Sequence, residues 1–302
     1  GAARSQPDES LRALANFTIQ EFDTLWGFVE SDLAKAWTTG RGRQSFVSPR
    51  DAVFMTLTVL KHYDTWRKHA IDFDLGLSSL EKVVHKVIGI IEPVLYKHLV
   101  KPVKMSDQVA AGKTFENYPY ALYATDVEFQ PAYRPSGRFN EQKVYFSAKH
   151  KLYGFNLECS VALPGVAVDL SKHSPGSASD LTMLLDRTQI HRHMLRKEPQ
   201  AAAEIDSEPT DFPNSWAMLV DKGYQGAFRN YFGRVCRLWN AMYLTYRWSE
   251  ASYDQVSRLC FALTNFHVNL MPLRAQDSDH YLSILAKYAS MGTQLREQRA
   301  RT

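Results

Sequence analysis

The 302-residue sequence has few cysteines and no long hydrophobic run, and both absences narrow the class of protein. Its three cysteines form no C-x-x-C pair, which excludes a thiolate zinc ribbon and favours a reducing, intracellular compartment. No stretch of about 18 apolar residues occurs, so we expect no contact with a membrane. No internal repeat is visible, and no basic cluster is strong enough to identify a nuclear localisation signal.

What the chain does contain is a moderate positive charge and many aromatic residues. The net charge is +4, which is compatible with a nucleic-acid partner without demonstrating one. A hydrophobic content of 45% and a charged content of 23% are ordinary for a globular protein. The length is sufficient for one large domain or two smaller ones.

The first third of the chain, residues 9–115, has the periodicity of helices. Ser48 directly precedes Pro49 and an apolar pattern with residues three and four apart, which predicts a helix capped by Ser48. Ser78 and Glu81 repeat this arrangement and predict the start of a second helix.

These two helices allow two interpretations. Gly76 lies in the connection between them, and a helix, a short turn and a capped basic helix are typical of a helix-turn-helix. Its second helix would present Lys82 and Lys86 to DNA. The alternative is a plain helical bundle with solvated lysines.

The second part of the chain has a different pattern. Segments rich in Tyr, Phe and Val predict three strands, at residues 118–133, 143–155 and 156–170. A capped helix, a short buried strand with the sequence WAMLV and further helices follow, which is the element order of a ribonuclease H-like fold. We therefore expect a helical region at 1–115, then an α/β core with a mixed sheet flanked by helices at 116–302.

Two aspartates are associated with these predicted strands. Asp126 lies in the first strand, and Asp221 directly follows the WAMLV strand. In the ribonuclease H order these strands are neighbours, and two close carboxylates repel unless a cation lies between them. Oxygen ligands suit Mg²⁺ or Mn²⁺, and such a pair is the core of two-metal phosphodiester chemistry. Alternatively, both aspartates are only turn residues.

Six sequence blocks occur in this order: YATDVEFQPAYRPSGRF, YFSAKHKLYGF, HSPGSASDL, LVDKGYQG, NYFGRVCRLW and YRWSEASYDQVSRLCFALTNFHVNLMPLR. Together they resemble the eukaryotic DDE-type transposases of the Harbinger-like group over roughly residues 15–295. The resemblance implies a ribonuclease H-like core, a nuclear location, and an Asp-Asp-Glu triad that holds divalent metal for DNA cleavage and strand transfer. The first two acids of that triad fall on Asp126 and Asp221.

The third acid of the triad does not match. Relatives have a glutamate directly before the Asn-aromatic-Phe-Gly-Arg block, where this chain has Arg229, and they have a long basic loop in place of the direct link from Gly226 to Ala227. A guanidinium repels a divalent cation that a carboxylate would attract. Glu250 and Asp254, on the next helical segment, are nearby acids that could replace the missing ligand. The alternative is that Ser249 and Glu250 cap that helix.

A basic segment follows the first aspartate. Cations mixed with aromatic residues suit a groove that follows phosphates and stacks bases. The alternative is that the aromatics form core and the lysines are solvated. The candidate DNA-binding residues are Arg134, Arg138, Lys143, Lys149 and Lys151.

The sequence leaves two functions open. The first is a transposase-derived DNA-binding protein with a degenerate metal site and no strand transfer, whose partners are DNA and either a second copy of the chain or another protein. The second is an active endonuclease or transposase that depends on Mg²⁺ or Mn²⁺. The residue at position 229 favours the first.

Overall fold

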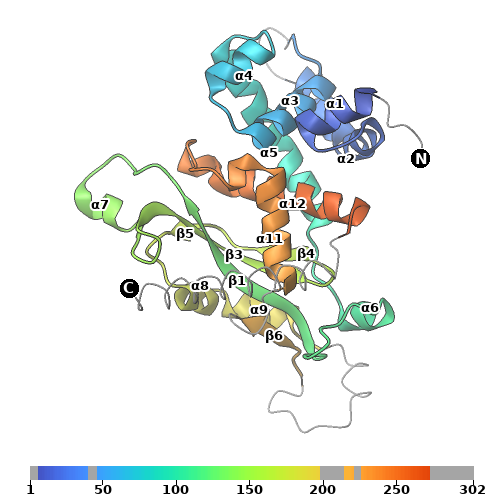
Figure 1. Cartoon of the computed structure of the whole chain (residues 1–302), viewed down its shortest axis with the longest axis vertical. Coiled ribbons are helices and arrows are strands. Elements are labelled where there is room, and N and C mark those ends of the chain that lie inside the picture. Colours follow the sequence, from blue (N-terminus) through green and yellow to red (C-terminus); the bar gives the residue numbers. More distant parts are fainter. Residues whose placement is uncertain (1–5, 40–45, 198–213, 221–225, 273–302) are drawn as a thin grey trace, which may run out of the picture.

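The computed structural model describes residues 6–39, 46–197, 214–220 and 226–272. A helical N-terminal region is followed by a mixed sheet flanked by helices, which confirms the predicted α/β class (Figure 1). No helix in these ranges combines the length and the apolar character that crossing a bilayer requires.

The N-terminal region consists of helices packed on one another. Their bounds are α1 (Gln6–Ala15), α2 (Ile19–Thr38), α3 (Pro49–His62), α4 (Trp66–Asp72), α5 (Leu77–Leu99) and α6 (Met105–Ala110). Ser48 caps α3 as predicted, since its Oγ accepts a hydrogen bond from the Asp51 N–H at 3.1 Å.

The predicted cap of the second helix, Ser78, is wrong. Helix α5 begins at Leu77, and Gly76 occupies the cap position without a side-chain hydrogen bond, so Ser78 already lies inside the helix. The connection from α3 is also not a single turn, because α4 lies between α3 and α5. Helix α5 continues through Pro93 to Leu99.

The sheet has the strand order β2-β3-β1-β6, with β4 and β5 also paired to β3. Strand β1 is antiparallel to β3 and parallel to β6. The strand bounds are β1 (Ala121–Pro131), β2 (Phe146–Ser147), β3 (Leu152–Ala162), β4 (Val166–Leu170), β5 (Ser174–Pro175) and β6 (Ala217–Val220). The predicted strand at 143–155 is only partly confirmed, because this range holds the short β2 at Phe146–Ser147 and then the start of β3 at Leu152.

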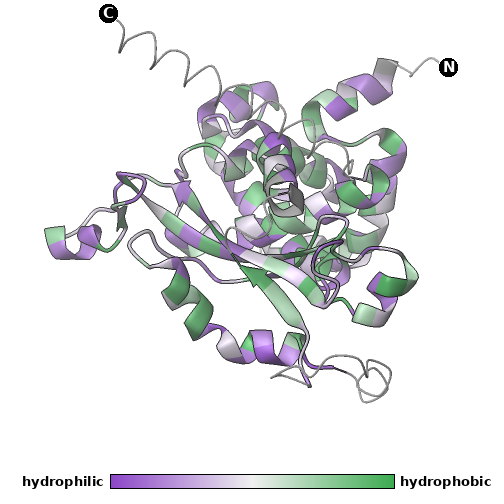
Figure 2. Ribbon diagram, turned by 60° about the horizontal axis from the view of Figure 1, so that its bottom comes forward, coloured by the Kyte–Doolittle hydropathy of each residue, from purple (hydrophilic) through white to green (hydrophobic). Residues whose placement is uncertain are grey.

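Helices cover both faces of this sheet (Figure 2). One face carries α8 (Asp180–Asp186) and α9 (Thr188–Met194). The other face carries α11 (Gly226–Leu238), the 3₁₀ turns η2 (Asn240–Met242) and η3 (Glu250–Ser252), and α12 (Tyr253–Leu270). Because side chains alternate along a strand, neighbouring residues of β1 point to different helical layers.

A buried polar cluster attaches the α8–α9 layer to the sheet. Arg187, between these two helices, donates from Nε to Glu158 Oε1 at 2.7 Å and also pairs with Asp169. His191 Nε2 lies 3.0 Å from the same glutamate oxygen, and its Nδ1 lies 3.0 Å from the Tyr123 hydroxyl oxygen. Since breaking a buried ion pair leaves an uncompensated charge, this cluster fixes the α8–α9 layer in one position.

Helix α12 lies between the sheet and the N-terminal helices, where it packs against α5 and β4 (Figure 1). The side chain of Asn265 in this helix is 1% exposed and makes four hydrogen bonds. The amide accepts from the Ala167 N–H at 2.9 Å and donates to the Ala167 carbonyl at 2.7 Å. It also accepts from the Tyr231 hydroxyl at 2.7 Å and donates to the Leu99 carbonyl at 2.9 Å.

Asn265 therefore completes the edge of the sheet. Among the described strands, β4 pairs only with β3, and the amide of Asn265 takes both backbone groups of Ala167 as a further strand would. The same side chain ties in the C-terminal end of α5 and the buried Tyr231 of α11. One residue thus joins the sheet, the C-terminal helices and the N-terminal region.

We expect Asn265→Ala to lower the free energy of unfolding by about 2–4 kcal/mol, because it leaves several buried polar groups without partners. Urea unfolding followed by tryptophan fluorescence measures this loss. The matched control is Asn240→Ala, which removes a half-buried amide that donates to the His62 carbonyl at 3.3 Å. Equal losses in the two variants would show that Asn265 does not hold the layers together.

Candidate nucleic-acid interface

Residues 132–151, called the arm below, leave the sheet between β1 and β3 and carry α7 (Phe139–Lys143) and β2. The arm projects at the left of Figure 1. It holds five lysines and arginines and one glutamate, so its net charge of +4 equals that of the whole chain. All the predicted DNA-binding residues of this segment are exposed: Arg134, Arg138, Lys143, Lys149 and Lys151.

Some of these cations are held in place by neighbours. Arg134 donates from Nε to Gln142 Oε1 at 2.6 Å, and its guanidinium carbon lies 5.5 Å from the centre of the Tyr153 ring. Lys149 Nζ lies 3.6 Å from Asp180 Oδ2, an exposed pair that contributes little to stability. The structure thus gathers the predicted cations on one projection, where phosphates can reach them.

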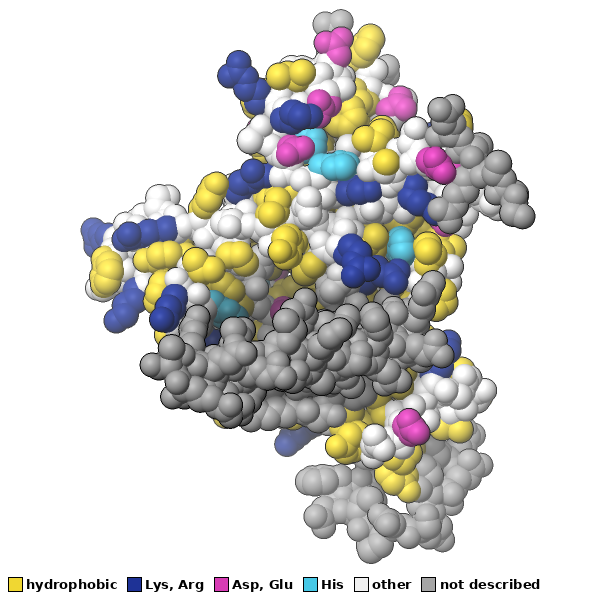
Figure 3. Space-filling view, in the orientation of Figure 1, with side chains coloured by type: hydrophobic (Ala, Val, Ile, Leu, Met, Phe, Trp, Pro, Cys, Tyr) yellow, Lys and Arg dark blue, Asp and Glu magenta, His cyan; other side chains and the backbone are white. Residues whose placement is uncertain are grey.

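The arm also exposes apolar side chains among its cations. Tyr133 and Phe139 are 65% and 66% exposed, and Val144 and Phe146 are exposed as well. Figure 3 shows this mixture of yellow and dark blue side chains on the projecting lobe. Exposed apolar groups that cluster in this way mark an interaction surface rather than an inert one.

A groove of about 300 Å³ lies between the arm and residues 176–180. The rings of Phe129 and His150 lie parallel in it, with their centres 4.4 Å apart and their planes 3° apart. Lys149 and Asp180 also line the groove, and both side chains are exposed to solvent. Its lining includes Val127, Phe129, Phe146, Lys149, His150 and Asn156.

Asp126 is exposed on β1, with its Oδ1 accepting from the Val127 N–H at 2.8 Å. By strand alternation it belongs to the face of Glu128 and Gln130, which line a small cavity beneath α11. The groove beside the arm is lined by Val127 and by Phe129, whose ring stacks on His150 there and which also borders the small cavity. Asp126 and the groove therefore lie on opposite faces of the sheet.

The predicted partner of Asp126, Asp221, lies outside the described residues. The parallel pairing of β1 with β6 includes the residues just before the two aspartates, since Thr125 of β1 is opposite Val220 of β6. Position 229, where the resemblance predicts the third acid, is in the first turn of α11 and is an arginine. Within the described ranges, no three His, Cys, Asp or Glu side chains are arranged to hold a metal ion. The described donors thus do not form a complete Mg²⁺ or Mn²⁺ site.

Lys82 and Lys86 come from a different part of the fold. Both are exposed on α5, in the N-terminal helical region at the top of Figure 1, whereas the arm is at the left. The Lys86 ammonium lies 4.5 Å from the centre of the Trp37 ring, so it packs on an aromatic neighbour of the same region. The structure does not bring these two lysines together with the arm.

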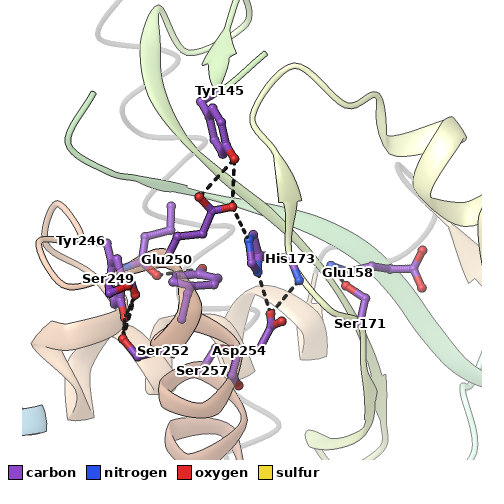
Figure 4. Close-up of polar contacts among 12 residues, drawn as sticks. Tyr145, Glu158, Ser171, His173, Tyr246, Ser249, Glu250, Ser252, Asp254 and Ser257 are labelled. Carbon is purple, nitrogen blue, oxygen red and sulfur yellow. Dashed lines mark hydrogen bonds and ion pairs between the residues drawn. The ribbon is translucent and has the colours of Figure 1, made fainter. Parts of the chain in front are cut away.

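The two acids considered as replacement ligands, Glu250 and Asp254, have another role (Figure 4). Asp254 Oδ1 lies 2.8 Å from His173 Nδ1, and Glu250 Oε1 lies 3.1 Å from His173 Nε2. The Tyr145 hydroxyl of the arm donates to Glu250 at 2.9 Å. Both carboxylates are therefore engaged by His173, and the network connects the arm to α12.

This network changes the pKa of its central groups. Burial alone would lower the pKa of His173, but hydrogen bonds to Asp254 and Glu250 outweigh burial and raise it. Burial likewise opposes ionisation of Asp254, but the hydrogen bonds from the His173 side chain and backbone lower its pKa. The hydrogen bonds thus favour the charged form of His173 beside the carboxylate of Asp254. Sequence reasoning missed the network, because His173 and Tyr145 are 77 and 105 residues from Glu250, their shared partner, and carry no local motif.

We expect His173→Gln to lower the free energy of unfolding by about 1–3 kcal/mol near pH 6, because it removes the cation between two carboxylates. The pKa of His173 is raised from 6.5 in the folded state, so this stabilisation is complete below that value and is lost as pH rises through the folded-state pKa. Urea unfolding of both proteins at about pH 6 and about pH 9 measures the difference.

The control for this experiment is His193→Gln, at an exposed histidine of α9, which we expect to behave like the wild type at both pH values. A loss in His173→Gln that is the same at both pH values would contradict a charged network.

Known proteins provide no template for this interface. The chain matches no protein-family model, no curated protein and no solved structure. The role of the arm and the groove therefore rests on the geometry and charge of their own residues.

Proposed function

We propose that this chain is a transposase-derived DNA-binding protein with a ribonuclease H-like core, a degenerate DDE metal site and no strand-transfer activity. The observation that carries the proposal is the arm, which concentrates a charge equal to that of the whole chain on one projection with exposed aromatic side chains. The resemblance to eukaryotic transposases extends this proposal to a nuclear, intracellular location.

The strand arrangement supports the ribonuclease H-like assignment. Antiparallel strands β4, β3 and β1 come first, and β6 then adds in parallel beside β1 after the α8–α9 layer. This is the order in which the sequence predicts the elements of that fold. Helices on both faces of the sheet agree with it.

The degenerate metal site rests on the exchange at position 229. If Asp126 and Asp221 form a pair at the junction of β1 and β6, the third ligand expected from the resemblance is replaced by Arg229. At an effective dielectric constant of about 20, unit charges about 4 Å apart interact by about 4 kcal/mol, so the exchange is unfavourable to a bound cation. Glu250 and Asp254 do not compensate, because both contact His173.

An active endonuclease or transposase dependent on Mg²⁺ or Mn²⁺ is the second candidate. The observation that favours it is the parallel register of Thr125 with Val220, because each of these residues directly precedes an aspartate of the predicted pair. This candidate requires a third ligand from the part of the chain outside the described residues.

We expect the triple variant Lys143→Ala, Lys149→Ala, Lys151→Ala to bind duplex DNA more weakly than the wild type. Each lost phosphate contact should reduce the slope of log affinity against log salt concentration by about 1, so the triple variant should lose about 2–3. Fluorescence anisotropy with a labelled duplex over a range of salt concentrations measures both quantities.

The matched control for the arm is Lys35→Ala, Lys97→Ala, Lys101→Ala, which removes three exposed lysines of the N-terminal region. A further double variant, Lys82→Ala with Lys86→Ala, tests whether α5 contributes. An equal loss of slope in the control and in the arm variant would refute the arm as the DNA interface.

The two candidate functions differ in DNA cleavage. We expect the wild-type chain to leave supercoiled plasmid intact in Mn²⁺, because its predicted metal site lacks the third acid. Restoring the acid with Arg229→Glu should allow nicking, and adding Asp126→Asn should abolish it. Nicking by the wild type that disappears in Asp126→Asn would establish the second candidate instead.

A further inference from the structure

The groove and the exposed rings of the arm indicate a more specific ligand than duplex DNA. We infer that the arm and the groove bind single-stranded DNA, with one unpaired base stacked on the His150 ring and the neighbouring phosphates along the cations of the arm. This inference rests on the proposed function, since it takes DNA as the partner, and it adds which form of DNA is bound and where.

The form of DNA follows from what each surface can recognise. Cations alone do not select a single strand, because both forms of DNA present phosphates. Aromatic faces do not, since the faces of paired bases are stacked inside a duplex and only unpaired bases can lie on a side-chain ring. A surface that exposes rings among its cations is therefore matched to a single strand.

The His150 ring is the best-placed platform. It is exposed, and its ring lies parallel to that of Phe129 at 4.4 Å within the groove. A base laid on the outer face of His150 would extend this stack by a third ring. The groove volume of about 300 Å³ is at the lower end of the range for small-ligand sites, which suits one nucleoside rather than a duplex.

Two glycines keep the ring beneath His150 in place. A Cβ on Gly154 would lie 2.5 Å from Phe129 Cζ, and one on Gly176 would lie 3.0 Å from Phe129 Cε2. The backbone therefore packs so closely against Phe129 that no other residue fits at Gly154 without a shift. A platform that is fixed before binding loses little conformational entropy when a base stacks on it.

The rest of the arm continues the pattern. Tyr133 directly precedes Arg134, and Arg138 directly precedes Phe139, so each of the two most exposed rings of the arm has a cation next to it. Lys149 is adjacent to His150 in the same way and lies at the rim of the groove. Alternating rings and cations match the alternating bases and phosphates of one strand.

This site for single-stranded DNA is separate from the predicted pair of metal-binding aspartates. Asp126 belongs to the sheet face covered by α11, whereas the groove opens on the face that carries α8. Binding at His150 therefore does not require Asp126, and loss of the metal site leaves the groove intact.

Anisotropy titrations with a labelled oligothymidine of about 20 nucleotides and with a duplex of the same length test the inference. We expect the wild type to bind the single strand at least about tenfold more tightly than the duplex at the same salt concentration. His150→Ala should weaken single-strand binding about tenfold and leave duplex binding within about twofold, whereas His150→Phe, which keeps a flat ring, should retain it.

Phe139→Ala tests the outer rings, and the matched control is Phe46→Ala, which removes a phenylalanine that is 98% exposed in the N-terminal region. Phe139→Ala should weaken single-strand binding, whereas Phe46→Ala should not. Equal affinity for both forms of DNA, unchanged by His150→Ala, would overturn the inference and leave the proposed function standing. If neither form of DNA binds at low salt, the proposed function fails together with the inference.

Discussion

The arrangement of the whole molecule depends on one buried amide. Asn265 occupies both backbone groups of Ala167 at the edge of the sheet, and the same amide bonds to the end of α5 and to Tyr231 of α11. A neighbouring strand could satisfy β4 but could not also attach the N-terminal helices. Because all four hydrogen bonds are made in the interior, the relative position of the three layers is strongly determined.

With the layers held in this way, the two faces of the sheet serve different purposes. Helices α11 and α12 cover the face to which Asp126 belongs, while α8 and α9 are attached to the other face by the buried cluster around Glu158. The arm leaves the sheet between β1 and β3, and its Tyr145 is connected to α12 through Glu250 and His173. The acid and the stacking groove are consequently separated by the thickness of the sheet.

Local signals predicted the elements whose determinants are close in sequence. The Ser48 cap and the first strand were correct, because a cap and a strand pattern depend on a few consecutive residues. The cap at Ser78 was wrong because the cap position is Gly76, two residues earlier. The single strand predicted at 143–155 is interrupted, as β2 and the start of β3, because a projecting arm and a strand share the same aromatic composition.

The sequence predicted which cations belong to the arm but not how the side chains of the arm and the groove are arranged. The cations of the arm were named from sequence, and the structure places all of them on one exposed projection. The Phe129–His150 stack depends on the register of β1 with β3 and on the close approach of Gly154 to Phe129. Neither can be predicted from a few consecutive residues. Glu250 and Asp254 were considered as metal ligands, yet the partner that engages them is a histidine 77 or more residues away in sequence.

The concentration of charge on the arm has a consequence for how the molecule meets a polyanion. Since the arm holds a formal charge equal to the net charge of the chain, the charges of the remaining residues sum to zero, and the arm is a local excess of positive charge. If DNA is the partner, as proposed, its negative potential would attract this excess charge and favour approaches with the arm forward. Orientation would then precede docking, so that such encounters present the arm and its groove first.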